Sequence, residues 1–284
     1  MKHLIVNADD FGLSNSINAG IINAHLNGIV TSVSMMANGE AFDDAIARVR
    51  QNPGLSVGIH FVLTEEKPEL PPWEVPTLVD NNGNFFRTYR QFFQRLFTGR
   101  INFSEIRNEL NAQLNKLLHA GVKPVHADGH DHLHIFPAIL DIVLDIAGEN
   151  GIRWIRHSHD TLTRAHSPAH LGLAALGKFG KKKILQRGFC SSDHFLGTRF
   201  SGRLSESNLL NMINKLPPGV SEIMCHPGNE DREFIAKYGH WHFRWKAEQT
   251  ALMSTTVKAR IAEKSILLTN YREQSAGEIK YANH

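Results

Sequence analysis

Residues able to bind a metal recur with unusual regularity between Val125 and Phe136, in the run VHADGHDHLHIF. Five of them fall at every second position: His126, Asp128, His130, His132 and His134. Residues two apart in an extended strand point to the same side, so this spacing predicts up to five polar groups on one face. Burying such groups unpaired is costly, and a divalent ion held by His and Asp is the simplest way to pair them. We therefore interpret the run as metal-binding, in preference to a solvated His-rich loop, because apolar residues are interleaved with the histidines.

Further acids and histidines end or follow other predicted strands. They are Asp9 and Asp10 after the strand at 3–8, His60 in the strand at 55–62, and His226 at the end of the strand at 220–226. Catalytic residues of β/α barrels gather at the carboxyl ends of the strands, so we expect these side chains to converge. Taken singly, each has a structural alternative, as a helix cap or a hydrogen-bonded core histidine. A His/His/Asp set with open coordination positions suits metal-assisted hydrolysis, with a nearby carboxylate to take the proton of the water.

Strands and helices alternate along the chain. The expected strands are 3–8, 29–37, 55–62, the His-rich run, 152–156, 220–226 and 265–271. The expected helices are 14–26, 41–50, 104–120, 137–149, 171–185, 206–216 and 246–262, and the Pro-rich segment 67–77 is expected to form a surface loop. This alternation predicts an α/β protein, with residues 1–284 forming a single distorted β/α barrel of about seven parallel strands. An open doubly wound sheet is disfavoured because no GxGxxG fingerprint follows the first strand.

Composition narrows the class of protein. Hydrophobic residues make up 42% and charged residues 21% of the 284 positions, which is ordinary for a soluble enzyme. The two cysteines lie far apart, against a disulfide framework or a thiolate zinc site, and the net charge of +3 gives no reason to expect a nucleic-acid partner. Without a signal-peptide pattern or a transmembrane stretch, we expect a cytoplasmic protein. The segment 170–187, apolar and then basic, could contact an anionic membrane surface, but an ordinary helix with a solvated end is the simpler interpretation.

With these residues in hand, the chain resembles the YdjC/ChbG family of carbohydrate deacetylases. The matching segments occur in the family's order: NADDFGLS (7–14), GIVTSVSMMANG (28–39), VGIHFVLT (57–64), KPVHADGHDHLHIFP (123–137), MCHPG (224–228) and NYRE (270–273). The resemblance implies a distorted β/α barrel and metal-dependent removal of N-acetyl groups from amino sugars. The segment 70–86 is similar, more loosely, to the HpnK branch associated with hopanoid lipids, which would make a glycolipid the substrate.

By position, the resemblance implies the roles of five residues. Asp10, His60 and His130 would hold one divalent metal, with water completing the shell. Zinc or magnesium is expected first, and manganese or cobalt would also suit this donor set. Asp9 would be the general base, and His226 a general acid or an oxyanion donor.

Three further residues would support the site. Asp128 would orient a metal ligand, His132 would face the pocket, and Arg272 would neutralise a carboxylate near the base. The family's usual Asp-Ser-His is Asp128-Gly129-His130 here, so any role of that hydroxyl is absent or filled by water.

Three functions remain open on sequence alone. The first is hydrolysis of the N-acetyl group of an amino sugar, either in a free oligosaccharide or linked to a lipid. The second is phosphoester hydrolysis by a two-metal site, for which the His-rich run has enough ligands. The third is a non-catalytic metal- or carbohydrate-binding protein with a closed coordination shell, against which the adjacent acids argue. A homodimer is the default expectation for such an enzyme.

Overall fold

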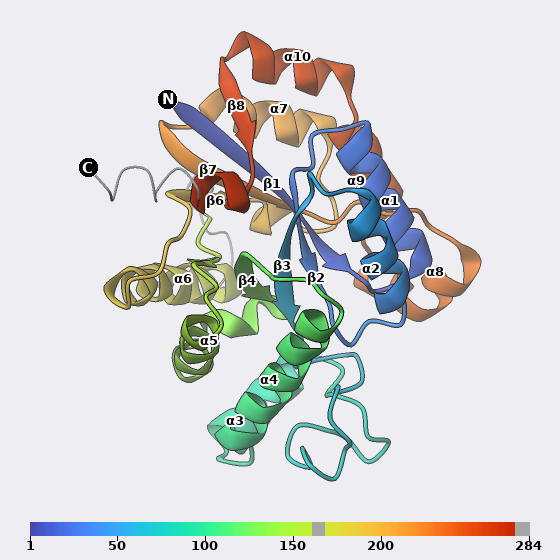
Figure 1. The fold of residues 1–284 in the computed structure, drawn as a ribbon, viewed down its shortest axis with the longest axis vertical. Helices are drawn as coiled ribbons and strands as arrows, with labels where there is room; N and C mark the ends of the chain where they lie inside the picture. Colours follow the sequence, from blue (N-terminus) through green and yellow to red (C-terminus); the bar gives the residue numbers. More distant parts are fainter. Residues whose placement is uncertain (161–167, 276–284) are drawn as a thin grey trace.

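The computed structural model describes residues 1–160 and 168–275, and its centre is one parallel sheet surrounded by helices (Figure 1). The strands are β1 (Lys2–Phe11), β2 (Ser32–Met35), β3 (Ser56–Phe61), β4 (His126–Gly129), β5 (Trp154–Ile155), β6 (His194–Leu196), β7 (Gly219–Cys225) and β8 (Ile266–Thr269). Their order is β5-β4-β3-β2-β1-β7-β6, with β8 paired to β1. Every pairing in this ladder is parallel, so all the carboxyl ends lie at one end of the sheet.

Strand β1 is the centre around which the sheet curls. It pairs with β7 through Lys2–Ala8, with β8 through Lys2–Ile5, and with β2 from Asn7 onward. At the outer edges, a single bridge joins Trp154 of β5 to Cys190, and another joins Asp160 to Phe195 of β6. The two edges are thus brought together without a continuous ladder, and the sheet forms an incomplete barrel. The prediction of a distorted parallel β/α barrel is confirmed.

Helices cover the outside of the barrel. They are α1 (Asn15–Leu26), α2 (Phe42–Gln51), α3 (Tyr89–Phe97), α4 (Phe103–His119), α5 (Pro137–Glu149), α6 (Pro168–Gln186), α7 (Glu206–Lys215), α8 (Arg232–Tyr238), α9 (Trp245–Leu252) and α10 (Thr255–Glu263). Local signals fix several ends: Ser14 caps α1 by accepting from the amide of Ile17, and Pro137 lies in the first turn of α5. The predicted helix at 246–262 is divided, because Ser254 caps a new helix, α10. Sequence missed α3, α8 and β6, which are too short to show a clear period.

The structure corrects the prediction for the His-rich run. Strand β4 ends at Gly129, and the next residues form a 3₁₀ segment, η1 (His130–Ile135). Asp131 and His132 adopt the left-handed conformation there, with φ of 54° and 56°. The alternation of side chains therefore stops at Gly129, because residues beyond it no longer follow the pleat. The expectation that five polar groups share one strand face is wrong.

Helix α6 contains most of the segment that is apolar and then basic in sequence. Leu171, Phe179 and Leu185 are exposed on it. Two of its lysines make hydrogen bonds within the protein: Lys183 Nζ donates to Asp141 at 2.6 Å, and Lys181 Nζ donates to the carbonyl of Ser192 at 2.9 Å. Contact with a membrane surface stays a prediction. In the part of the chain described, we find no helix with the length and apolar character needed to cross a membrane.

Candidate active site

A bulge in β1 brings two consecutive aspartates to one pocket. Ala8 pairs with Val33 of β2 but Phe11 pairs with Met35, so β1 contains one residue more than its partner at this point. Asp10 has a φ of 63°, which a short polar side chain tolerates better than most. In a regular strand, neighbouring side chains point to opposite faces, whereas bulges next to active sites redirect them. Asp9 and Asp10 consequently both line the same cavity.

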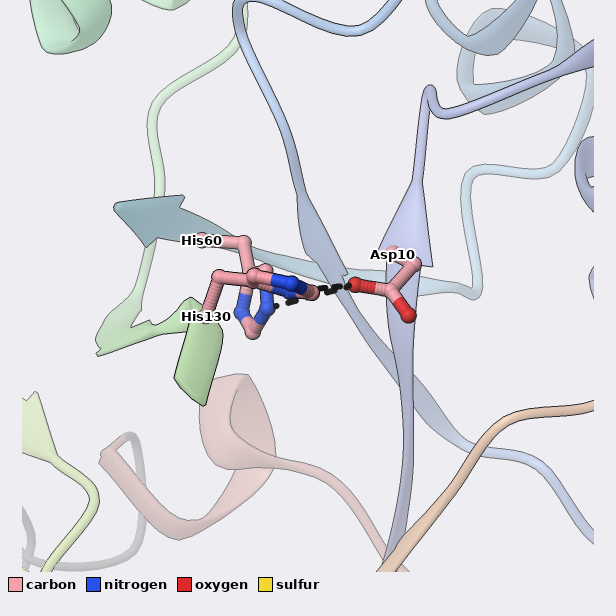
Figure 2. Close-up of side chains that lie close together, drawn as sticks. All are labelled: Asp10, His60 and His130. Carbon is pink, nitrogen blue, oxygen red and sulfur yellow. Dashed lines mark hydrogen bonds and ion pairs between the residues drawn. The ribbon is translucent and has the colours of Figure 1, made fainter. Parts of the chain in front are cut away.

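Asp10, His60 and His130 converge from three separate elements (Figure 2). Asp10 Oδ1 lies 3.1 Å from Nδ1 of His130 and 3.5 Å from Nε2 of His60. Asp10 Oδ2 and His60 Nε2 are buried and make no hydrogen bond to any residue the structure describes. Buried polar atoms without partners are costly, and two imidazoles with one carboxylate are a donor set suited to a divalent metal. The three residues therefore fit the predicted metal site.

The charges of the three side chains depend on one another. Burial alone would raise the pKa of Asp10, but the hydrogen bond from His130 and the nearby imidazole of His60 hold it well below its usual value. Burial would lower the pKa of His60, yet the carboxylates of Asp128 and Asp10 raise it to about 10. Burial would also lower the pKa of His130, but Asp10 raises this pKa to about 9. The site thus demands positive charge, which either protons or a divalent ion can provide, so the two compete.

Asp128 holds the ring of His60 from behind. The two residues are register partners on β3 and β4, and Asp128 Oδ1 lies 2.7 Å from Nδ1 of His60. Asp128 Oδ2 accepts from Ser34 Oγ at 2.6 Å and lies 2.8 Å from Nη1 of Arg156. A carboxylate on the far nitrogen fixes both the tautomer and the orientation of a histidine ligand. The position of Asp128 therefore suits the orienting role predicted for it.

Arg156, which the sequence analysis missed, binds the candidate base. Its Nη1 donates to Asp9 Oδ2 at 2.6 Å and its Nη2 donates to Asp9 Oδ1 at 2.8 Å, while its Nε donates to Glu222 at 2.7 Å. The side chain is fully buried, and these carboxylates raise the already high pKa of the guanidinium further. The pattern of acids and histidines in the sequence gives no signal for this arginine, although Arg156 ends the predicted strand at 152–156. The fork geometry holds Asp9 in one orientation.

The placement predicted for Arg272 is wrong. Its guanidinium donates to the carbonyl oxygens of Pro53 and Leu55, at 2.9 and 3.5 Å. These residues precede β3, so Arg272 lies at the end of the sheet opposite the site. The guanidinium beside the candidate base belongs to Arg156 instead. Tyr271, next to Arg272, is the residue of this segment that enters the barrel, where its ring lies 3.9 Å from that of His126.

A cavity of about 540 Å³ opens above the metal-site residues. His226 and His132, both proposed from sequence, lie in its wall together with Asp9. Burial lowers the pKa of both histidines, for His132 well below its usual value, so both rings are neutral near pH 7. His132 Nδ1 lies 3.0 Å from Ser158 Oγ, and the backbone amide of His226 donates to Glu248 at 2.6 Å. The cavity thus combines a carboxylate with two neutral imidazoles.

Two further groups of side chains come close enough to hold an ion, Asp9 with His60 and Asp128, and Glu65 with His130 and Asp131. In the first group, Arg156 already binds both carboxylates. In the second, the indole of Trp241 donates to Glu65 and the hydroxyl of Thr64 donates to Asp131 at 3.0 Å. Burial raises the pKa of Glu65 to about 7. These contacts give the two-metal hypothesis no support.

Fold and site together define an incomplete parallel β/α barrel with an Asp–His–His group at the carboxyl ends of its strands. The profile of the YdjC-like protein family matches residues 3–263, and the chain belongs to this family.

Two relatives match the chain over almost their whole lengths. A carbohydrate deacetylase of Thermoanaerobacter pseudethanolicus is 31% identical over 271 residues, covering 95% of this chain and 98% of the relative. A chitooligosaccharide deacetylase of Escherichia fergusonii is 35% identical over 269 residues, covering 94% and 97%. Among solved structures, a protein of Enterococcus faecalis named for cellobiose-phosphate cleavage superposes with a TM-score of 0.77 at 29% identity, covering 96% of this chain and 98% of the other.

Proposed function

We propose that this protein is a metal-dependent carbohydrate deacetylase that hydrolyses the N-acetyl group of an amino sugar. The observation that carries the proposal is the convergence of Asp10, His60 and His130 beside Asp9 in one cavity. Relatives of matching length that are named carbohydrate or chitooligosaccharide deacetylases support it.

Asp10, His60 and His130 would hold the metal. A divalent ion bound there supplies polarisation of the acetyl carbonyl and a lowered pKa for water. Asp9 takes the proton from the attacking water, as general base, and passes it to the leaving nitrogen when the C–N bond breaks. Its Oδ2 accepts a hydrogen bond from Arg156 alone among the described residues, so a lone pair remains for that proton. Arg156 keeps the carboxylate aimed at the cavity.

The two neutral histidines in the cavity act on the other side of the amide. Burial lowers the pKa of His226, and its Nδ1 has no hydrogen-bond partner in the described chain. A neutral imidazole is suited to donating a hydrogen bond to the developing oxyanion, so this role is favoured over that of general acid. His132 faces the same cavity and binds the sugar.

One observation favours a substrate that carries an apolar group. A groove of about 420 Å³ adjoins the cavity and shares Tyr89, Phe93, Phe136 and Leu176 with it. Phe97, which is 73% exposed, completes its apolar wall. A lipid attached to the sugar would bury more apolar area there than the sugar itself. The lipid-linked amino sugar is therefore the second candidate substrate.

The test is acetate release from N-acetylglucosamine oligomers and from an N-acetylglucosaminyl glycolipid. We would compare chelated protein, protein reloaded with zinc, magnesium, manganese or cobalt, and the Asp9→Asn variant. Activity should return with metal and be lost in Asp9→Asn, while Asp43→Asn on the exposed face of α2 should behave as wild type. If metal binds stoichiometrically but neither substrate yields acetate, the substrate assignment fails.

A further inference from the structure

The chain after β7 returns over the cavity and places a tryptophan beside the metal site. Trp241 ends the 3₁₀ segment η3 (Gly239–Trp241) and lies in the cavity wall. The centroid of its ring lies 5.3 Å from that of His130. Tyr238 and Phe243 pack around the indole, at 5.1 and 5.6 Å between centroids. The indole is therefore a large, half-buried apolar surface held next to a candidate metal ligand.

Two consecutive glutamates fasten this segment to the turn after β3. The indole nitrogen of Trp241 donates to Oε2 of Glu65, and the hydroxyl of Tyr238 donates to Oε1 of Glu66 at 2.8 Å. Glu65 has a φ of 70°, a conformation that non-glycine residues keep only where the surroundings impose it. Its carboxylate lines the cavity and is only 15% exposed. Both side chains are thus held in place before any ligand binds.

Glu65 and Trp241 both line the cavity. Since Glu65 satisfies the indole N–H, the ring face of Trp241 can serve as an apolar contact surface. Oε2 of Glu65 carries the bond from Trp241, while Oε1 receives no hydrogen bond from any residue that the structure describes. An apolar ring face beside a carboxylate oxygen matches a pyranose ring, which offers C–H groups on its face and hydroxyls at its edge.

We propose that Trp241 and Glu65 form the sugar-binding subsite of this cavity. The indole packs against one face of the pyranose ring, and Glu65 Oε1 accepts a hydrogen bond from a sugar hydroxyl. Because Trp241 lies beside His130, a sugar on the indole presents its N-acetyl substituent to the metal-site residues. The inference rests on the proposed deacetylase function and assigns the residues that determine its specificity for a sugar.

Steady-state kinetics on N-acetylglucosamine oligomers test the subsite. Trp241→Phe keeps an aromatic ring in the packing but removes the indole N–H and part of the surface, and Glu65→Gln keeps the shape but removes the charge. We expect KM to rise by about tenfold in each, with a smaller change in kcat and unchanged metal content. The matched control is Trp73→Phe on the Pro-rich loop, where the indole is 78% exposed.

Binding of the deacetylated product, glucosamine dimer, to metal-loaded protein gives a readout independent of turnover. Isothermal titration should show about tenfold weaker binding in Trp241→Phe and Glu65→Gln than in wild type and Trp73→Phe. Unchanged KM and unchanged binding in both variants, with wild type active, overturn the subsite alone. If wild type releases no acetate, the proposed function fails and the titration decides: binding weakened in both variants supports the subsite, and absent or equal binding overturns it.

Discussion

Replacing Arg156 with methionine should destabilise the protein severely. The guanidinium makes four contacts of 2.6 to 2.8 Å with three buried carboxylates, those of Asp9, Asp128 and Glu222. Methionine fills similar space but removes the guanidinium from all three acids. Removing one partner of a buried ion pair costs about 3–5 kcal/mol, against a total stability of about 5–15 kcal/mol for a typical domain. We expect a loss at the upper end of that first range.

The matched control is Arg187→Met. Arg187 also contacts two carboxylates, Asp145 at 2.8 Å and Asp141 at 3.9 Å, but its side chain is 43% exposed. Surface pairs of this kind contribute at most about 1 kcal/mol. Urea unfolding followed by circular dichroism measures both, compared at equal m-values. A loss of less than about 1 kcal/mol in Arg156→Met would refute the assignment of Arg156 as the counter-ion of the site.

A second variant separates stability from catalysis. Arg156→Lys keeps the positive charge but loses the fork that holds both oxygens of Asp9. We expect this variant to fold and to bind metal, with acetate release reduced mainly in kcat, because the base is no longer held in one orientation. Wild-type kcat in Arg156→Lys would show that Arg156 does not position Asp9.

Three further predictions follow from the same geometry. Asp128→Asn should weaken metal binding by about 10–100-fold in a chelator competition, because the carboxylate behind the ligand on β3 is lost; equal affinity would exclude the orienting role. Gly58→Ala should cost about 1–3 kcal/mol in urea unfolding, since its Cβ would lie 2.3 Å from the ring of His126, whereas Gly54→Ala, with open space around it, should be near neutral. Burial lowers the pKa of His126 and of His157 to about 3, so the unfolded chain takes up protons below pH 6.5 that the folded protein does not. The free energy of unfolding should fall between pH 7 and 5 by about 2 kcal/mol for each of these histidines. In His157→Gln, the slope of this free energy against pH should be smaller by the equivalent of about one proton.

The architecture could be predicted because it depends on patterns that are local along the chain. Alternating apolar strands and amphipathic helices specified parallel β/α construction, and the helices predicted at 14–26 and 137–149 begin at Asn15, after its cap Ser14, and at Pro137. Short elements such as α3 and β6 were missed, since a few residues carry too little periodicity to be distinguished from a loop. The gathering of Asp9, Asp10, His60 and His130 at one end was also foreseeable, because parallel strands share the end at which they finish.

Only the tertiary structure decided in which direction the side chains point and which residues distant in sequence they contact. The bulge that turns Asp9 and Asp10 to one cavity depends on pairing with the neighbouring strand β2. The left-handed turn at Asp131, which ends the alternation of the His-rich run, lies beyond the end of β4. Arg156 lies 147 positions from Asp9, and nothing in the local sequence links them. The sequence alone determined which end of the barrel carries the chemistry. The sequence could not show which cation neutralises Asp9, because Arg156 comes within reach of it only when the barrel is assembled. A buried carboxylate depends for its charge partner on the groups that the folded interior brings close to it.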